Sequence, residues 1–251
     1  MLDKNKIISL NVHRISFDQS IELVTQWALA QRPGYVCFAN VHMTIEAYKD
    51  SGFSNQVNEA DLVLPDGNPI AKAITNFYKK NQERICGMDF TPRILKVADE
   101  HNLSIFIYGA SAATLRSTEE KIFSLYPNVR MAGSISPPYH HLTENEIMND
   151  IRIINESGPH IVFVALGCPK QEKWMAEHSN KINAILLGIG AALPVLAGLE
   201  KRAPKWMQNI SLEWLYRLVQ QPRRLFFRYL YTNSYFIFLR SRDRIRAWLK
   251  K

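Results

Sequence analysis

The sequence lacks the short motifs that mark the commonest metal and cofactor sites. Its three cysteines, Cys37, Cys86 and Cys168, lie far apart and form neither a CxxC pair nor a Cys/His metal spacing, so we expect reduced, buried thiols. It contains no Asp-x-Asp, no Gly-x-Gly-x-x-Gly and no Gly-Lys-Ser or Gly-Lys-Thr sequence. These absences argue against a carboxylate-held metal, a nicotinamide-binding turn and a Walker loop, and we expect neither a metal nor a cofactor.

Hydrophobic runs long enough to span a membrane are also missing. The best candidate, residues 225–239, is too short and contains Arg228 and Asn233. The first residues carry two lysines but only a short apolar run broken by Asn11, which is not the pattern of a secretory signal peptide. The sequence therefore predicts a cytoplasmic protein, peripheral on the inner face of the cell membrane if it contacts lipid.

The positive charge of the chain is confined to its last part. Residues 200–251 contain 13 Lys/Arg against 3 Asp/Glu, whereas residues 1–199 contain 18 against 20, so the segments carry +10 and −2. Many aromatic side chains lie between these basic residues. A basic amphipathic helix on anionic lipid explains both features, and each Lys or Arg near the surface adds about 1 kcal/mol. A single-stranded nucleic acid is the alternative partner, because it offers phosphates and stacking bases.

Apolar runs alternate with amphipathic patterns through residues 1–199. The runs predict strands buried on both faces at 34–41, 61–67, 103–110, 160–167 and 183–190. Helical patterns occupy 111–127 and 143–158, and Thr143 with Glu146 forms a capping-box signal for the second. The alternation thus predicts an α/β fold with a Rossmann-like parallel sheet in a domain at 1–199, and the charge pattern predicts a basic, aromatic-rich helical appendage at 200–251.

Polar and glycine residues follow several predicted strands, at the edge where open parallel sheets bind ligands. Asp66 lies in a Pro–Asp–Gly turn, where it is either a general base or ordinary turn chemistry. Asp89 is a second candidate base, with helix N-capping as its alternative. The candidate ligand-binding residues at these ends are Asn40, Gly109, Lys170, Gln171 and Gly190. Simple strand-to-helix turns and a solvated helix start are the structural alternatives for them.

Three arginines of the appendage, Arg217, Arg224 and Arg228, are spaced by seven and four residues. A continuous helix places them on one face, although Pro222 can kink or restart that helix. They form either a solvated charged stripe or a surface for anionic groups.

Several stretches in order resemble the WecG/TagA/CpsF glycosyltransferases. They are "LPDGNP", "RICGMDF", "SPPY", "GCPKQEKWM", "GIGAALPVLAG" and "KRAPKWMQNISLEWLYRLVQQPRRLFFRYL". The resemblance implies metal-independent, inverting transfer of a sugar from a UDP-sugar to a polyprenyl-diphosphate-linked sugar (undecaprenyl diphosphate in bacteria) during exopolysaccharide or other surface-polysaccharide biosynthesis. It also implies that the appendage contacts the membrane and completes the active site.

The resemblance carries over to individual positions. Asp66 matches the general base of the family, Asn40 and Gln171 match polar residues of its pocket, and the three appendage arginines match residues that reach the donor diphosphate. Phe38 and Pro194 depart from the family pattern near the expected donor pocket, which leaves the donor sugar open. A chain that has lost activity and a homo-oligomer formed through the tail are further alternatives.

Overall fold

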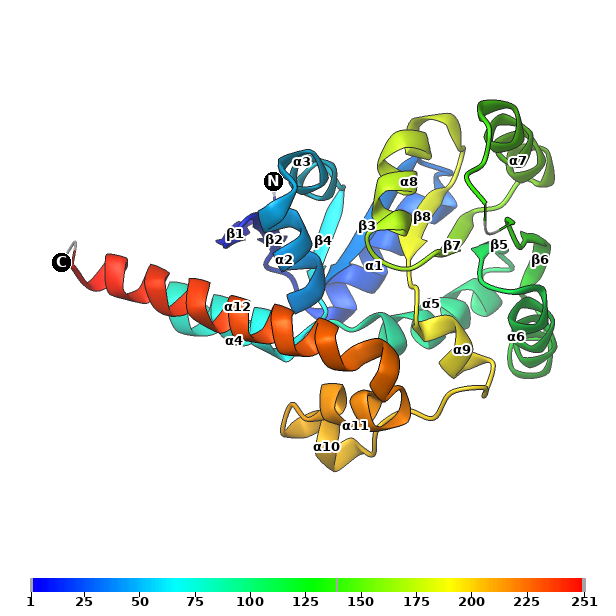
Figure 1. Ribbon diagram of the computed structural model, residues 1–251. Helices are drawn as coiled ribbons and strands as arrows, with labels where there is room; N and C mark the ends of the chain where they lie inside the picture. Colours follow the sequence, from blue (N-terminus) through cyan, green and yellow to red (C-terminus); the bar gives the residue numbers. More distant parts are fainter. Residues whose placement is uncertain (1, 139, 250–251) are drawn as a thin grey trace.

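The computed structural model describes residues 2–138 and 140–249, and Figure 1 shows its layers. Tyr139 of the "SPPY" stretch and residues 250–251 of the predicted appendage lie outside the described residues. In the described part, a six-stranded parallel sheet has the order β4-β3-β8-β7-β5-β6, and a separate antiparallel hairpin pairs β1 with β2. The strands are β1 (Lys4–Ile7), β2 (Leu10–His13), β3 (Gly34–Ala39), β4 (Leu62–Pro65), β5 (Ser104–Gly109), β6 (Arg130–Ile135), β7 (Ile161–Ala165) and β8 (Ile185–Gly188).

Helices follow most strands of the sheet. Those of the first 199 residues are α1 (Phe17–Leu29), α2 (Val41–Lys49), α3 (Ser51–Asn58), α4 (Asn68–Tyr78), α5 (Gly87–Glu100), α6 (Ala112–Leu125), α7 (Glu144–Ser157), α8 (Lys170–His178), the 3₁₀ turn η1 (Ser179–Lys181) and α9 (Ala192–Leu196). The Rossmann-like α/β prediction is confirmed. All five predicted strands exist, and the Thr143–Glu146 capping box opens α7 as predicted.

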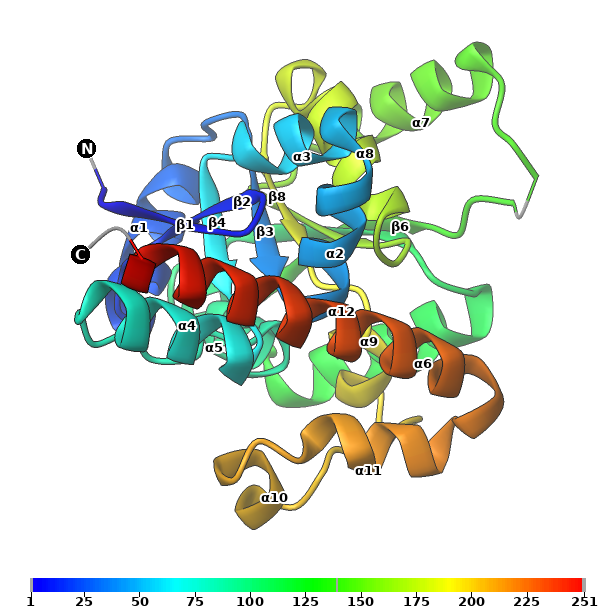
Figure 2. The ribbon, with the colours of Figure 1, turned by 60° about the vertical axis from the view of Figure 1, so that its left-hand side comes forward.

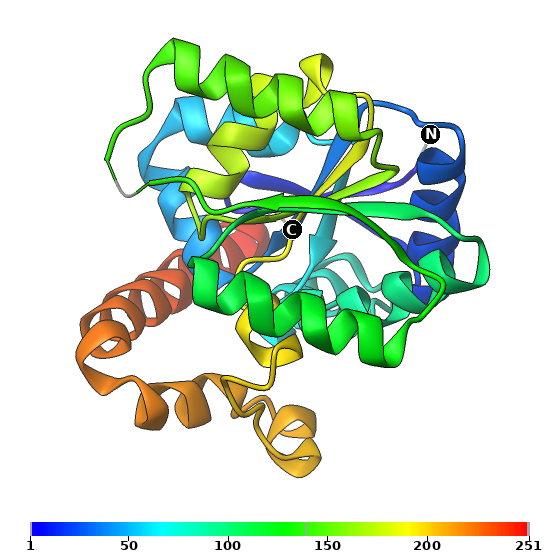
Figure 3. The same ribbon diagram turned by 90° about the vertical axis from the view of Figure 1, so that its right-hand side faces the viewer.

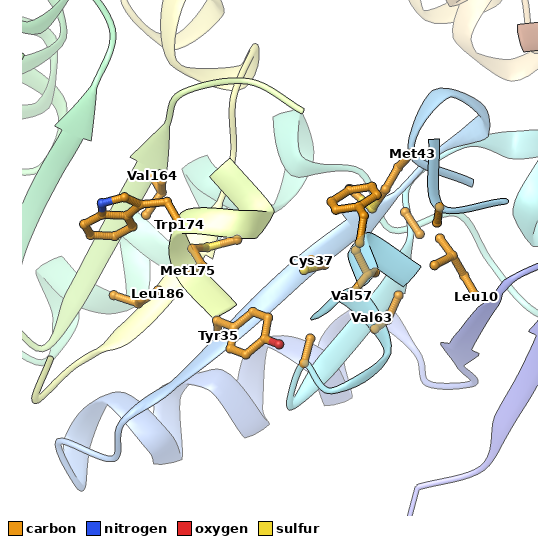
Figure 4. Packing of buried hydrophobic residues seen from close by; sticks show 14 of the residues in the cluster. Leu10, Tyr35, Cys37, Met43, Val57, Val63, Val164, Trp174, Met175 and Leu186 are labelled. Carbon is orange, nitrogen blue, oxygen red and sulfur yellow. The ribbon is translucent and has the colours of Figure 1, made fainter. Parts of the chain in front are cut away.

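The sheet is buried on both faces because each strand sends alternate side chains to opposite layers. On β3, Tyr35, Cys37 and Ala39 face the layer formed by α2, α3, α7 and α8. Val36 and Phe38 face the opposite layer, formed by α1, α5, α6 and α9. Figure 3 shows helices on the two sides of the sheet, and Figure 4 shows the first layer from close by. The free thiols of Cys37 and Cys86 are buried as predicted, whereas Cys168 is partly exposed.

The C-terminal appendage is helical and folds back over the body. It contains α10 (Lys205–Asn209), α11 (Glu213–Gln220) and the 28-residue α12 (Pro222–Leu249), so Pro222 begins a new helix. Figures 1 and 2 show α12 lying across α2 and α4, while α10 and α11 project from the body. Contacts along α12 include the edge-on pair of Tyr48 and Tyr235, with ring centroids 5.6 Å apart. Among the α12 side chains that the structure describes, Leu225, Thr232, Phe236 and Leu239 are buried.

Among the described residues, none of the helices combines the length and the apolar character that crossing a membrane requires.

Candidate active site

The strand order places the two strongest candidates on neighbouring strands. Asn40 follows β3 and Asp66 follows β4, and the two strands are parallel with Ala39 opposite Pro65. The Asp66 N–H donates to the carbonyl of Ala39 at 2.9 Å, which fixes the turn after β4 against the end of β3. The Asn40 amide Nδ2 then lies 3.4 Å from Asp66 Oδ2. The two predicted site residues therefore meet.

The orientation of Asn40 follows from its place at the start of α2. Its Oδ1 accepts from the backbone N–H of Met43 at 3.1 Å, so Asn40 is the N-cap of α2. The cap holds the carbonyl end of the side chain on the helix, which leaves the Nδ2 end for the Asp66 carboxylate. The structural role of Asn40 thus points its amide donor into the candidate site.

The Asp66 carboxyl lies in a partly buried environment of mixed charge. Burial raises its pKa above the usual range, and the charge of Glu213 raises it further. Arg84 and hydrogen bonds from Cys86 and Asn40 lower the pKa, but the net change is upward. A carboxylate with a raised pKa holds a proton more readily at neutral pH than an exposed one, which suits a general base.

Asp89 does not occupy the position that the sequence predicts for an N-cap. The N-cap of α5 is Cys86, with no side-chain cap bond, and Asp89 lies in the first turn of the helix. Its carboxylate accepts two hydrogen bonds from Arg202, at 2.6 and 2.8 Å. Burial raises the pKa of Asp89, but the Arg202 bonds outweigh it and the net pKa is lowered. The geometry therefore makes Asp89 an ion-pair partner. The N-capping alternative is wrong, and its role as a second base stays a prediction.

Gln171 is buried and its amide contacts the ends of two strands. Its Oε1 accepts from the Gly167 N–H at 3.2 Å, and its Nε2 donates to the Gly188 carbonyl at 3.0 Å and to Glu172 Oε1 at 2.6 Å. A Cβ at Gly190 would lie 3.0 Å from Gln171 Oε1, so the glycine leaves room for this amide. Gln171 thus joins β7 to β8, and its contact with substrate stays a prediction.

The other strand-end candidates lie farther along the sheet. Gly109 ends β5, four strand positions from β4, which corresponds to about 19 Å at about 4.8 Å per strand. The N–H groups of Ala110 and Gly190 already donate to β7, at 3.1 and 3.3 Å. Lys170 is the first residue of α8 and its side chain is exposed. The predicted phosphate contacts near Gly109 and Gly190 would therefore have to come from other backbone N–H groups close by.

The three appendage arginines come from two helices, and the charges of all three act on Tyr229. Arg217 lies on α11, whereas Arg224 and Arg228 lie on α12. Burial raises the pKa of Tyr229, and the charges of all three arginines act against that rise. In the described part of the chain, none of the three guanidinium groups forms an ion pair. They remain available to an anionic ligand.

Arg228 also approaches the strand end that carries Asn40. Burial lowers the pKa of His42, and the nearby charge of Arg228 lowers it further. His42 lies two residues after Asn40 on α2, so the appendage brings a cation to the end of β3.

The two positions that depart from the family pattern have structural roles. Phe38 is buried below Asn40 and packs edge-on against Phe90, with ring centroids 5.2 Å apart. Pro194 lies in the first turn of α9, where its missing N–H is tolerated, and its carbonyl accepts from Leu199 and Glu200. Phe38 fills the layer beneath the site.

Sequence reasoning missed a group of charged residues that connects the body to the appendage. Arg84 Nε donates to the Asp66 carbonyl at 2.7 Å, and its Nη2 lies 2.6 Å from Glu213 Oε2 on α11. Arg202 Nε lies 3.6 Å from Glu213 Oε1. All three residues occur in stretches that carry the family resemblance, but their pairing joins positions 129 residues apart. Nothing in the local sequence indicates such a pairing.

No group of three or more His, Cys, Asp or Glu residues suited to holding a metal ion occurs within residues 2–138 and 140–249.

Comparisons with known proteins bear on this site. The sequence profile of the glycosyl transferase WecG/TagA/CpsF family matches residues 5–250. The chain is similar to an N-acetylglucosaminyldiphosphoundecaprenol N-acetyl-beta-D-mannosaminyltransferase of Bacillus subtilis (strain 168), with 31% identity over 220 residues covering 85% of this chain and 84% of the relative. A protein of the same name from Staphylococcus aureus (strain MW2) is 26% identical over 196 residues, which cover 76% and 74%. These matches confirm the resemblance read from the motifs and favour it over the nucleic-acid hypothesis.

Proposed function

The chain belongs to the WecG/TagA/CpsF family and is a glycosyltransferase, and from this premise we propose that it moves a sugar from a UDP-sugar to a sugar carried on polyprenyl diphosphate. The observation that supports this most directly is the meeting of Asn40 and Asp66 at the sheet edge, with the charge of Arg228 from the appendage acting on His42 nearby. A base, a hydrogen-bond donor and cations for a diphosphate are the groups that this reaction needs.

Asp66 is the proposed general base. Its carboxylate takes the proton of the acceptor hydroxyl while that oxygen attacks the anomeric carbon of the donor. The bond from the anomeric carbon to the β-phosphate oxygen breaks, and UDP leaves with the electron pair. Because UDP-sugars are α-linked, a direct displacement gives a β-linked product. The names of both relatives specify a β-linked sugar, which supports inversion.

The leaving diphosphate is the proposed ligand of the appendage. The charges of Arg217, Arg224 and Arg228 all act on Tyr229, none of them forms an ion pair among the described residues, and they would stabilise the charge that develops on UDP. We assign this work to the protein's own cations, with no metal and no cofactor. The end of β5 at Gly109, about 19 Å away by strand spacing, is the proposed position of the nucleoside half of an extended donor.

The donor and acceptor sugars follow the relatives as a first hypothesis. Both are named for transfer of N-acetylmannosamine to N-acetylglucosamine on diphosphoundecaprenol. Phe38 and Pro194 are the two positions where this chain departs from the family pattern, so donors other than N-acetylmannosamine belong in the same test.

The lipid acceptor requires the enzyme to work at a membrane, and the appendage is the proposed contact. Its exposed apolar side chains include Trp206, Trp214, Val219, Phe226 and Phe227, the last 77% exposed. Arg223, Arg224 and Arg228 are exposed beside them on α12. A surface that combines aromatic and basic side chains suits an anionic bilayer on the cytoplasmic face.

The test is UDP release from a panel of UDP-sugars with polyprenyl-diphosphate-sugar acceptors in anionic liposomes. We expect acceptor-dependent release from one donor. Asp66→Asn should lower the rate by about 10²–10⁴-fold, because general-base catalysis contributes that much, while donor binding is kept. Asp18→Asn, at the exposed start of α1, is the matched control and should keep wild-type activity. Full activity in Asp66→Asn would remove Asp66 from the mechanism.

A further inference from the structure

A chain of alternating charges joins the appendage to the segment around Asp66. It runs from Asp89 to Arg202, on to Glu213 and then to Arg84, with closest charged-atom distances of 2.6, 3.6 and 2.6 Å. Asp89 and Arg84 belong to the body, whereas Arg202 and Glu213 belong to the appendage. Arg202 and Glu213, the two members that belong to the appendage, therefore each contact a member that belongs to the body.

The central members of this charge chain are shielded from solvent. The side chains of Glu213, Arg84 and Arg202 are only 13%, 17% and 20% exposed. Ion pairs at this level of burial are strongly coupled, since removing one partner leaves the other charge without compensation. Exposed pairs such as Arg152 with Glu156, at 59% and 62%, lack this property.

Arg84 also contacts the proposed base. Its Nε donates to the backbone carbonyl of Asp66 at 2.7 Å, while its Nη2 donates to Glu213 Oε2 at 2.6 Å. The planar guanidinium fixes the relative positions of these two partners. A change at Glu213 is therefore transmitted to the turn that carries Asp66.

We propose that Glu213 is a positioning residue, which docks the appendage through Arg84 and Arg202 and thereby sets both the geometry and the charge environment of Asp66. The proposal rests on the role of Asp66 given above. It assigns to Glu213 a role that is separate from the binding of the diphosphate by the appendage arginines, namely holding the turn that carries Asp66.

The charged and titratable groups that face Asp66 determine in which direction its pKa changes when Glu213 is replaced. Arg84 from the α4–α5 segment, Cys86 at the start of α5, Asn40 at the start of α2 and Glu213 from α11 are the groups that act on it. Glu213 in turn faces Arg84, Arg202 and, on α12, Tyr229. Loss of the negative charge at Glu213 removes a repulsion from Asp66 and leaves the positive charge of Arg84 uncompensated. Both effects lower the pKa of Asp66.

The experiment compares wild type with Glu213→Gln, Glu213→Asp and Arg84→Gln in the full-length chain. We measure kcat/KM against pH in the UDP-release assay and hydrogen–deuterium exchange across α11. Glu213→Gln should lose about 100-fold in kcat/KM, as expected for displacement of a reacting group by about 1 Å. The acidic limb of its kcat/KM profile against pH should move to lower pH, and hydrogen–deuterium exchange in α11 should increase. Glu213→Asp keeps the charge and should keep the position of the limb.

The matched control is Glu156→Gln on α7, which makes the same substitution in an exposed ion pair. In an Arg84→Gln background, Glu213→Gln should cost less than about threefold more if it acts through Arg84. If Glu213→Gln loses activity but the acidic limb of its pH profile does not move, the variant has lost packing only, and this overturns the proposal. An unchanged exchange rate in α11 overturns it as well. Activity retained in Asp66→Asn would instead refute the proposed function.

Discussion

At the scale of single residues, Gly109 illustrates how the sheet edge is built. Its φ is +111°, and a Cβ there would lie 2.7 Å from the backbone of Ala165 on β7. The close approach brings the ends of β5 and β7 together, which any larger residue prevents. The packing of β5 against β7 therefore requires a glycine at position 109, whether or not that residue contacts a phosphate.

Gly109→Ala should lower the free energy of unfolding by about 3 kcal/mol, because the positive φ and the overpacking each add a cost of about 1–2 kcal/mol. Gly158→Ala is the control, since Gly158 also has a positive φ of +60° but nothing within 4 Å of its would-be Cβ. It should cost only about 1 kcal/mol. Urea unfolding of both variants measures the difference. Equal losses would show that the contact with Ala165 relaxes freely.

Glu172 gives a pH prediction of the same scale. The residue is fully buried, its Oε2 has no hydrogen-bond partner among the described residues, and burial raises its pKa to about 7. Between about pH 4.5 and 7 the folded state holds this proton more tightly than the unfolded state. The contribution of Glu172 to stability therefore falls as pH rises through that window.

Glu172→Gln should remove this fall, which amounts to about 3 kcal/mol at about 1.4 kcal/mol per pH unit. Because buried histidines such as His13 titrate nearby with the opposite slope, the informative quantity is the difference between wild type and variant. Chemical unfolding at pH 5 and at pH 8 measures it. A difference that does not change with pH would mean that Glu172 is exposed to solvent in the folded protein.

The candidate site was predictable only where local sequence decides geometry. Asp66 and Asn40 follow apolar runs, so the pattern placed both at the carboxyl edge of the sheet. Their contact depends in addition on β3 and β4 being neighbours, which the pattern does not give. Arg84 and Glu213 pair across 129 residues, and only the path of the appendage brings them together. Tertiary folding, not spacing, decides such contacts.

At the scale of elements, α12 shows how an aromatic helix can be attached along one side only. Leu239 is fully buried against the body, whereas Ile237 and Phe238 are 64% and 59% exposed. Leu239→Ala should release α12 locally, because truncating a buried leucine costs about 2–5 kcal/mol. Hydrogen exchange should then rise in α12 and not in the sheet.

The control for this prediction is Leu187→Ala on β8, which removes an equally buried leucine from the central sheet. That change should lower the stability of the whole body. If both variants lower it equally, α12 is part of the same cooperative unit as the sheet.

Element prediction succeeded for strands buried on both faces and failed for the others. Strand β6 mixes polar, small and apolar residues, "RMAGSI", and is partly buried or exposed throughout, so it gives no apolar run. The hairpin of β1 and β2 consists of strands of four residues, "KNKI" and "LNVH", which are too short and too polar to stand out. Both are stabilised by neighbours that the local sequence does not reveal.

At the scale of the whole molecule, the exposed apolar residues gather on the appendage. Phe227→Ser should weaken binding to anionic vesicles by roughly tenfold or more, since inserting a Phe side chain is worth about 1.5–3 kcal/mol. Phe123→Ser on α6 is the control, because Phe123 is exposed too, at 55%, but lies on the body. Vesicle co-sedimentation measures both. Equal binding by the two variants would place the membrane contact elsewhere.

The charge chain from Asp89 to Arg84 also limits how this protein can be recombined. Two of its members lie before residue 199 and two lie after it, so a chimera that takes its body from one relative and its appendage from another inherits half of each pair. A graft at this boundary needs all four positions transferred as a set. This charge chain therefore matches the appendage to its own body. Exchange of substrate preference between relatives is better attempted by substitutions within the body alone.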